Sequence, residues 1–354
     1  PPAPPPERLM ALLGIEIGDL PTHAKLGLPA DERRAAQPGG ERESLRLMES
    51  FLEDRGRWYF RSMSAPVEAA RACSRLSPHL AYGTISLKTV VQTARAHAAA
   101  IRAEDPTSPW LRSLSALDER LHWHCHFIQK LESEPRIEFE SLVRSYDALR
   151  TQIDPARLDA WTHGMTGYPL VDACMRALMH TGWLNFRMRA LIVSFAAYDL
   201  WLPWQVLATA RPCVWLDYEP GIHVCQFQMQ SGVSGARTLR IYNPTKQAQD
   251  QDPQGAYIRR YVPELARVPN TFIHAPWLMP DDLQRRSGCM IGKHYPAPIV
   301  DHERAQRTAR ARITELRRHP AVVAETQAVL EQHSGRRMNP PRRAANPIIG
   351  PRQL

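Results

Sequence analysis

One stretch, residues 166–189, constrains the fold of this chain more than any other. It reads TGYPLVDACMRALMHTGWLNFRMR, and its apolar residues recur at the spacing of a helix. Gly182 is the residue type that ends such a helix, so a tight turn is expected there. A second helix is expected from residue 183, and it places Arg189 among apolar side chains. Because a buried charge needs a partner, Arg189 predicts either an ion pair or a polar pocket.

A polar cluster further along the chain supplies possible partners for this arginine. Asp217, Glu219 and His223 follow an apolar segment that is rich in tryptophan. A purely structural ion pair is one interpretation, since isolated buried charges are costly. The neighbouring tryptophans favour a second interpretation, which is a polar pocket that holds a flat heterocycle.

The composition is typical of a globular cytoplasmic protein. Hydrophobic residues make up 44% of the 354 residues, which is enough for a sizeable core. No apolar run approaches the roughly 18 residues of a membrane span, and no signal peptide is visible. The six cysteines form no CxxC pair, which favours reduced thiols. His122 and His126 have the spacing of metal ligands, but their helix face offers no acidic third ligand, so no metal is expected.

The charge balance favours a polyanionic partner. The formal net charge is +9, and residues 301–354 contribute +6 of it through eleven arginines and five acidic residues. Basic side chains that neutralise phosphates release counterions, which drives binding to nucleic acids. The alternative is that the basic tail only keeps the protein soluble.

Hydrophobic periodicity predicts an all-α protein, because neither a strand–helix alternation nor a dinucleotide-binding fingerprint is found. Residues 1–38 are expected to form a linker or an N-terminal wrap. Residues 39–320 are expected to form one helical domain, and residues 321–354 a basic, partly disordered tail. Within the domain, a long helix over 110–132 and a final helix over 299–318 are expected.

Three further motifs accompany the first stretch. They are Ser74-Arg-Leu-Ser-Pro78, Arg240-Ile-Tyr-Asn-Pro244 and the segment DPQGAYIRRYVPEL at 252–265. In this order, over roughly residues 39–300, the motifs resemble those of the photolyase/cryptochrome flavoproteins. The resemblance covers the helical FAD-binding domain of that family and not its N-terminal antenna domain. It therefore implies a short, monomeric form that binds FAD and lacks the antenna domain.

The resemblance implies a set of FAD-binding side chains. They are Tyr59, Cys73, Ser74, Arg75, Leu76, Ser77, His124, Phe127, Trp183, Phe186, Arg189, Asp217, Glu219 and His223. In the family, the loop at Ser74–Ser77 holds the diphosphate, and the match to Arg189 pairs with the match to Asp217. Glu219 matches the position that accepts from the flavin N3–H, where Asp is usual. His223 stands where an Asn commonly faces flavin N5, and an imidazole is expected to titrate near neutral pH.

The same resemblance implies a set of side chains around the substrate. They are Trp123, Trp183, Arg120, Glu119 and Met229. Trp123 matches a tryptophan that packs against the flipped lesion. Arg120 stands where the family has an acidic residue, with Glu119 one position earlier. Met229 replaces a second lesion-stacking tryptophan, so Trp123 is left as the main aromatic wall.

Two further roles are carried over by position. Arg187 and Arg240 match residues that face the DNA groove, so contacts to phosphates are expected from them. Trp204 matches the middle member of the tryptophan chain through which the family photoreduces its flavin. Phe227 and Thr151 occupy the other two places of that chain, and Phe does not readily donate an electron.

These matches favour light-driven repair of cyclobutane pyrimidine dimers in UV-damaged DNA, by electron transfer from reduced FAD. Loss of one stacking wall favours lesions in single-stranded DNA, because extruding a base costs least there. The alternative is a cryptochrome-like blue-light receptor that binds FAD without repair, which the replaced acid and His223 favour. A basic helical nucleic-acid-binding protein without flavin is a third hypothesis.

Overall fold

The computed structural model describes residues 22, 24–27, 33, 35–210, 212–235 and 239–333. Within these residues the protein is all-α, as the periodicity predicts, and its only bridge of strand type is isolated and joins Ile291 to Tyr295. None of the described helices is both long and apolar enough to cross a bilayer.

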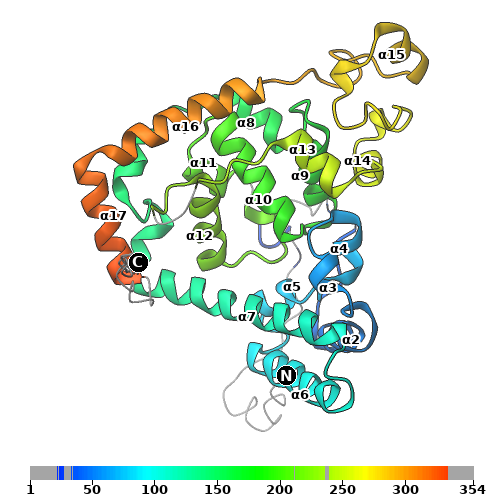
Figure 1. Ribbon diagram of the computed structural model, residues 1–354, viewed down its shortest axis with the longest axis vertical. Coiled ribbons are helices and arrows are strands. Elements are labelled where there is room, and N and C mark those ends of the chain that lie inside the picture. Colours follow the sequence, from blue (N-terminus) through cyan, green and yellow to red (C-terminus); the bar gives the residue numbers. More distant parts are fainter. Residues whose placement is uncertain are drawn as a thin grey trace, which may run out of the picture.

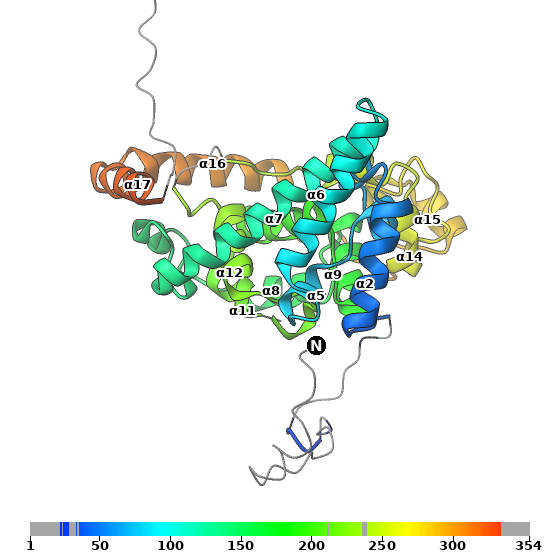
Figure 2. The ribbon, with the colours of Figure 1, turned by 90° about the horizontal axis from the view of Figure 1, so that it is seen from below.

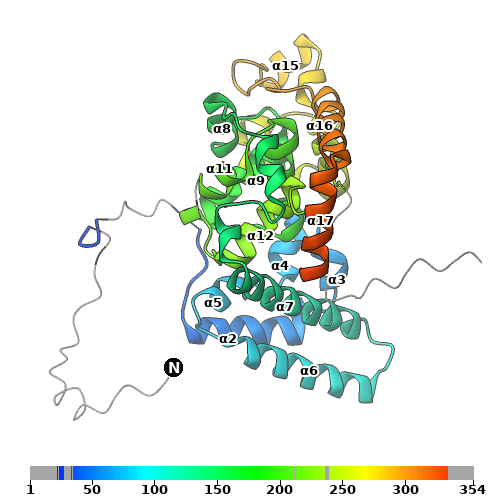
Figure 3. The same cartoon turned by 90° about the vertical axis from the view of Figure 1, so that its left-hand side faces the viewer.

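The helices up to residue 133 enclose a small hydrophobic core. They are α2 (Glu41–Ser50), the π-helix η1 (Phe51–Arg55), α3 (Tyr59–Ser62), α4 (Pro66–Ala72), α5 (Ser77–Ala81), α6 (Leu87–Glu104) and α7 (Pro109–Ser133). Figures 2 and 3 show α6 lying along α7, with α2 beside them. The long helix expected over 110–132 is thus confirmed as α7, which gives this core Leu114, Leu117 and Leu121.

The helices after residue 133 enclose a larger core. They are η2 (Pro135–Glu138), η3 (Arg144–Leu149), α8 (Pro155–Thr162), α9 (Pro169–Thr181), α10 (Phe186–Ser194), the π-helix η4 (Phe195–Asp199), α11 (Trp204–Thr209), η5 (Pro212–Val214), α12 (Pro220–Ser231), α13 (Pro244–Gln251), α14 (Ala256–Tyr261), η6 (Pro263–Leu265), η7 (Pro276–Leu278), α15 (Asp281–Ser287), α16 (His302–Arg318) and α17 (Pro320–His333). In Figure 1, α9, α10 and α12 lie at the centre, and α16 and α17 border them. Helix α7 also reaches this core through Phe127, so it joins the two cores.

The turn between α9 and α10 confirms the main expectation from the sequence. Gly182 ends α9 in the left-handed conformation, with φ at 72°. A Cβ at this position would lie 2.5 Å from Cγ of Leu216, so glycine is also required for close approach. The second helix begins at Phe186, three residues later than expected, because Asn185 is extended. The side-chain amide of Asn185 donates to the Met63 and Ser64 carbonyls, which ties α10 to the α3–α4 connection.

The helix expected over 299–318 is confirmed as α16, which Asp301 caps by accepting a hydrogen bond from the Arg304 N–H. A further helix, α17, occupies the first part of the segment expected to be a tail. Its Glu325 accepts hydrogen bonds from the backbone N–H groups of Arg144 and Ser145, so α17 docks on η3. Residues 334–354 and most of residues 1–38 lie outside the described part of the chain.

Candidate functional site

An ion pair between Arg189 and Asp217 lies at the centre of the candidate site. Nη2 of Arg189 donates to Oδ2 of Asp217 at 2.6 Å, and its Nε donates to the Leu184 carbonyl at 2.8 Å. The guanidinium carbon lies 4.5 Å from the ring centre of Trp215. The Asp217 side chain is only 5% exposed and that of Arg189 27%. Arg189 is thus half-buried rather than buried, and it has the partner expected for it.

The turn at Gly182 positions this carboxylate. The Leu216 N–H donates to the Gly182 carbonyl at 2.9 Å, which fixes the residue before Asp217 against the end of α9. Oδ1 of Asp217 is buried, and no hydrogen bond reaches it from the described residues. Leaving a buried acceptor without a donor costs about 1–3 kcal/mol, so Oδ1 marks a place for a ligand donor.

The Ser74–Pro78 loop is held by Arg55. Nη1 of Arg55 donates to the Cys73 carbonyl at 2.7 Å, and Nη2 approaches the first residue of the loop at 3.4 Å. Leu76 is anchored in the small core, and Ser77 begins α5. Burial raises the pKa of the Cys73 thiol to about 12, so this position is a neutral thiol. Nothing in the sequence motif predicts the supporting role of Arg55, because its contacts are to backbone carbonyls.

Arg75 joins this loop to the ion pair. Its guanidinium carbon lies 3.9 Å from the ring centre of Trp183, and its φ of 64° is unusual for a residue with a side chain. Burial lowers the pKa of Arg75 to about 10, and the nearby Asp217 charge acts in the opposite sense. Strained backbone of this kind is concentrated at functional sites.

A second contact to Arg75 comes from the segment before α2, and sequence reasoning missed it. Nε of Arg75 donates to Oε1 of Gln37 at 3.0 Å, and Nε2 of Gln37 donates back to the Arg75 carbonyl at 3.0 Å. The Ala35 N–H donates to the His180 carbonyl, so this segment also touches the end of α9. The part of the expected wrap that is described thus runs across the loop.

His223 is buried on α12 beside aromatic rings. Its ring centre lies 4.4 Å from that of Phe227 and 4.9 Å from that of Tyr218. Nε2 lies 3.0 Å from the Ala208 carbonyl, which can only accept, so Nε2 carries the proton and Nδ1 is left as an acceptor. Burial lowers the pKa of His223 to about 4. The expectation that this imidazole titrates near neutral pH is therefore wrong, because desolvation disfavours its charged form.

Arg120 on α7 contacts Tyr59 at the start of α3 and Phe186 at the start of α10. Its guanidinium carbon lies 5.2 Å from the ring centre of Phe186, which is 44% exposed at the start of α10. A hydrogen bond between Arg120 and Tyr59 lowers the pKa of this tyrosine, but burial prevails and raises it to about 12. Arg120 therefore faces the site from the position where the resemblance implies an acid.

One turn further along α7, aromatic side chains continue this surface. Trp123 stacks on Phe127 with ring centres 5.6 Å apart and planes inclined by 25°. His124 has a buried Nδ1 that no hydrogen bond reaches from the described residues. Burial lowers the pKa of His124, whereas the charge of Glu219, at the start of α12, raises it. These four side chains therefore line the junction of α7 with α12.

Other residues expected from the resemblance lie around this centre without a described contact to it. The guanidinium of Arg187 lies 5.8 Å from the ring of Tyr242, and Arg240 is exposed. Glu119 is exposed on α7, and Met229 packs against the larger core. Arg240 is thus available to solvent, as a contact to phosphates requires, whereas Arg187 is half-buried.

The three positions that match the family's tryptophan chain differ in burial, and only Trp204 among them is a tryptophan. Trp204 is 2% exposed, and its Nε1 donates to the Ser141 hydroxyl at 2.9 Å. Phe227 is buried beside His223, whereas Thr151 is exposed. Trp204 is therefore a buried tryptophan, and Phe227 is the ring that lies beside His223.

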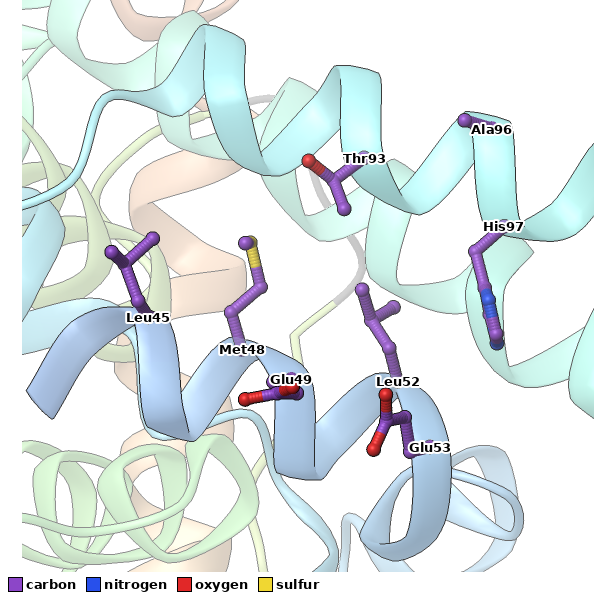
Figure 4. Close-up of a pocket in the computed structure, with 8 residues that line it drawn as sticks. All are labelled: Leu45, Met48, Glu49, Leu52, Glu53, Thr93, Ala96 and His97. Carbon is purple, nitrogen blue, oxygen red and sulfur yellow. The ribbon is translucent and has the colours of Figure 1, made fainter. Parts of the chain in front are cut away.

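A separate hollow lies between α2 and α6 (Figure 4), and none of the residues of the candidate site lines it. Leu45, Met48 and Leu52 line it, and Glu49 and Glu53 border it. An apolar floor with acidic borders does not suit a diphosphate, so this hollow is not the candidate site. Among the residues that the structure describes, no three His, Cys, Asp or Glu side chains gather as metal ligands.

Comparisons with known proteins agree on one family. Residues 116–315 match the family model described as the FAD binding domain of DNA photolyase. A deoxyribodipyrimidine photo-lyase of Alkalihalophilus pseudofirmus is 31% identical over 76% of this chain and 54% of its own length. Cryptochrome DASH of Gloeobacter violaceus is 32% identical over 85% of this chain and 60% of its own length.

Solved structures give the same result. The crystal structure of a class III photolyase from Agrobacterium tumefaciens superposes with a TM-score of 0.72 at 30% identity, over 79% of this chain and 56% of that one. A cryptochrome from Synechocystis superposes with a TM-score of 0.74 at 29% identity, over 82% of this chain and 60% of that one. The chain thus spans little more than half the length of these relatives.

The arrangement of the candidate site fits FAD. Arg75 and Arg189 place two positive charges near the single negative charge of Asp217. The remaining positive charge suits an anion such as a diphosphate. Oδ1 of Asp217 lacks a donor within the described residues, and the flavin ring system carries an N–H. The ring of Trp183 beside Arg75 offers a flat apolar surface. Charge, hydrogen-bonding capacity and shape therefore all suit this cofactor.

Proposed function

Because the chain belongs to the photolyase/cryptochrome family and carries its FAD-binding domain, we propose that it repairs cyclobutane pyrimidine dimers in DNA under light. Bound FAD in its reduced form would supply the electron that splits the dimer. The protein would bind the cofactor, hold the flipped dimer and exclude water. The observation that carries this proposal is the aromatic and basic surface beside the candidate FAD site.

Two groups of residues would hold the cofactor. Arg75 and the loop at Ser74–Ser77 would bind the diphosphate, because Arg75 is half-buried and positively charged there. The Arg189–Asp217 pair would lie beside the flavin, with Oδ1 of Asp217 free to accept a hydrogen bond from it, and Glu219 would accept from the flavin N3–H. His223 would present Nδ1 as an acceptor, since its Nε2 proton is held by the Ala208 carbonyl.

The dimer would lie against α7 and the start of α10. Trp123 is stacked on Phe127, so its ring orientation is fixed before substrate arrives. Arg120 lies next to the exposed Phe186 and offers a positive charge to a flipped dinucleotide, so Trp123 remains the main aromatic wall. Arg187 and the exposed Arg240 would contact the phosphates on either side.

We further propose a preference for dimers in single-stranded DNA. Extruding a base from a duplex costs a few kcal/mol, and this cost is least for a base that is already single-stranded. Met229 offers no aromatic ring where a second stacking surface would otherwise help to meet that cost. Arginines contact the phosphates of single-stranded and duplex DNA alike, so these contacts do not offset the cost of extruding the dimer from a duplex.

The experiment is a light-driven repair assay on an oligonucleotide with one thymine dimer, as a single strand and as a duplex at the same ionic strength. The expected result is repair in light and none in the dark, faster for the single strand. Arg187→Ala should weaken substrate binding more than Arg286→Ala, which removes an exposed arginine paired with Asp282 on α15. Equal or faster repair of the duplex would contradict the strand preference.

A cryptochrome-like receptor without repair activity is the second candidate, and Arg120 favours it. Arg120 is hydrogen-bonded to Tyr59 and occupies the position where the family has an acidic residue. The site therefore lacks an acidic contact to the lesion at this position. Cryptochromes are also as similar to this chain as photolyases are. FAD-loaded protein that repairs neither substrate in light would support this function and contradict the repair proposal.

A further inference from the structure

An exposed aromatic and basic surface lies on α3 and the start of α7, outside the candidate FAD site. Trp58 is 44% exposed just before α3, and its ring centre lies 6.2 Å from that of Phe60. The guanidinium of Arg61 lies over both rings, 5.2 Å and 5.3 Å from their centres. Arg57 lies 5.7 Å from the Trp58 ring, and Arg112 lies 4.5 Å from the Phe60 ring. These five residues are called the Trp58 platform.

The platform is not explained by packing. Tyr59, between its two aromatic residues, is the one that enters the small core, where its ring meets that of Phe51. Trp58 belongs to neither hydrophobic core and remains 44% exposed. Within the described residues, no ion pair involves Arg61 or Arg112, although Asp105 lies near Arg57. Rings and positive charges gathered in this way suit a partner that has flat bases and phosphates.

We propose that the Trp58 platform binds single-stranded nucleic acid, with a base stacked on Trp58 and phosphates held by Arg61 and Arg112. An exposed indole can stack only on a base whose face is free, and the bases of a duplex already cover one another's faces. Every base has such a face, so binding is expected to be independent of sequence. The inference rests on the proposed function, because it extends the surface that would hold the damaged strand.

The position of the platform suits this role. Helix α3 lies against α7 (Figure 1), and the Ser113 hydroxyl donates to the Arg57 carbonyl at 2.9 Å. Arg112 and Arg120 are eight residues apart on α7, which is about 12 Å along a helix. A stacked strand rises about 3.4 Å per nucleotide, so this distance corresponds to about three or four nucleotides. One strand could therefore contact the site and the platform together.

The test is binding of a fluorescent, undamaged oligothymidine of about twelve nucleotides, measured in the dark at several salt concentrations. The length exceeds the about four nucleotides that separate the two surfaces. Trp58→Ala should weaken binding about fivefold or more, the lower end of what one stacked base contributes. Trp58→Phe keeps an aromatic face and should recover most of that loss. Arg61→Ala should lower the slope of log affinity against log salt by about 0.7, the value for one phosphate contact on a single strand.

Two controls make the outcome specific. Arg286→Ala removes an exposed arginine elsewhere and should change neither affinity nor slope. A duplex of the same sequence should be insensitive to Trp58→Ala. The inference is overturned if Trp58→Ala binds the single strand within about twofold of the unchanged protein, or weakens the duplex equally. It is overturned as well if Arg61→Ala leaves the salt slope unchanged.

The proposed function can fail separately from this inference. The binding assay uses undamaged DNA in the dark, so it requires neither light nor repair. Protein that shows the expected losses but repairs no dimer would contradict the repair proposal alone. Protein that repairs dimers but binds oligothymidine equally well after Trp58→Ala would overturn the platform alone. Circular dichroism of each variant establishes that it is folded, and Trp58→Phe provides a second reading if the alanine variant is not.

Discussion

The burial of His223 predicts a measurable loss of stability in acid. Its ordinary pKa of 6.5 falls to about 4 in the folded protein because burial disfavours the charged ring. The unfolded chain therefore binds a proton at a pH where the folded chain does not. Acidification then favours unfolding, so this contribution is lost as the pH falls from about 6.5 toward 4. Above pH 6.5 the neutral ring is present in both states and contributes no pH dependence.

The shift sets the size of the effect. A pKa difference of this size corresponds to about 3 kcal/mol when it is fully expressed. At about pH 5 the unfolded imidazole is almost fully charged and the folded one is still mostly neutral, so about 2 kcal/mol should be lost relative to about pH 7.5. His79 and His124, whose pKa values burial also lowers, act in the same direction, so the effect must be measured as a difference between proteins.

The assay is urea unfolding of the protein and of His223→Asn at about pH 7.5 and about pH 5. The unchanged protein should lose about 2 kcal/mol more than the variant between the two conditions. His122→Asn, which removes an exposed imidazole of α7, is the matched control for the substitution itself. Equal losses in the unchanged protein and in His223→Asn would refute the reasoning, because they would show that His223 is as easily protonated when folded as when unfolded.

Two further predictions concern buried carboxylates. Arg189→Met should lower stability by about 3–5 kcal/mol or release bound FAD, because Asp217 would remain as a buried charge without its partner. Thermal unfolding and the flavin content of the purified variant measure these effects. Unchanged values for both would contradict the prediction. Asp172→Ala should lower the free energy of unfolding in urea by about 3 kcal/mol or more, since the Asp172 carboxylate accepts hydrogen bonds from the N–H and hydroxyl of Thr166 and from the Tyr295 hydroxyl. A loss below about 1 kcal/mol would show that these donors find other partners.

Local patterns in the sequence predict the centre of the site well. Gly182 ends a helix in the left-handed conformation because few other residue types adopt it at low cost. Arg189 on an apolar stripe requires a partner, and the acidic residues after the Trp-rich segment were the available ones. The all-α class follows from periodicity alone, since the helical repeat dominates the whole described domain.

Contacts that close the site from a distance could not be predicted in this way. Arg55 supports the Ser74–Pro78 loop through backbone carbonyls, and such acceptors have no signature in a sequence. Gln37 meets Arg75 from a segment whose composition predicts only a linker. The pKa of His223 depends on which rings surround it, and that is set by the packing of α12. Each case depends on tertiary packing between segments that are far apart in the chain or have no regular pattern.

The most direct test of the candidate site is a crystal structure of the protein with FAD bound. The account predicts the diphosphate at the Ser74–Ser77 loop beside Arg75, and the flavin ring beside the Arg189–Asp217 pair with a hydrogen bond to Oδ1 of Asp217. Density for FAD in the hollow between α2 and α6, or a flavin that leaves Oδ1 of Asp217 without a donor, would contradict it.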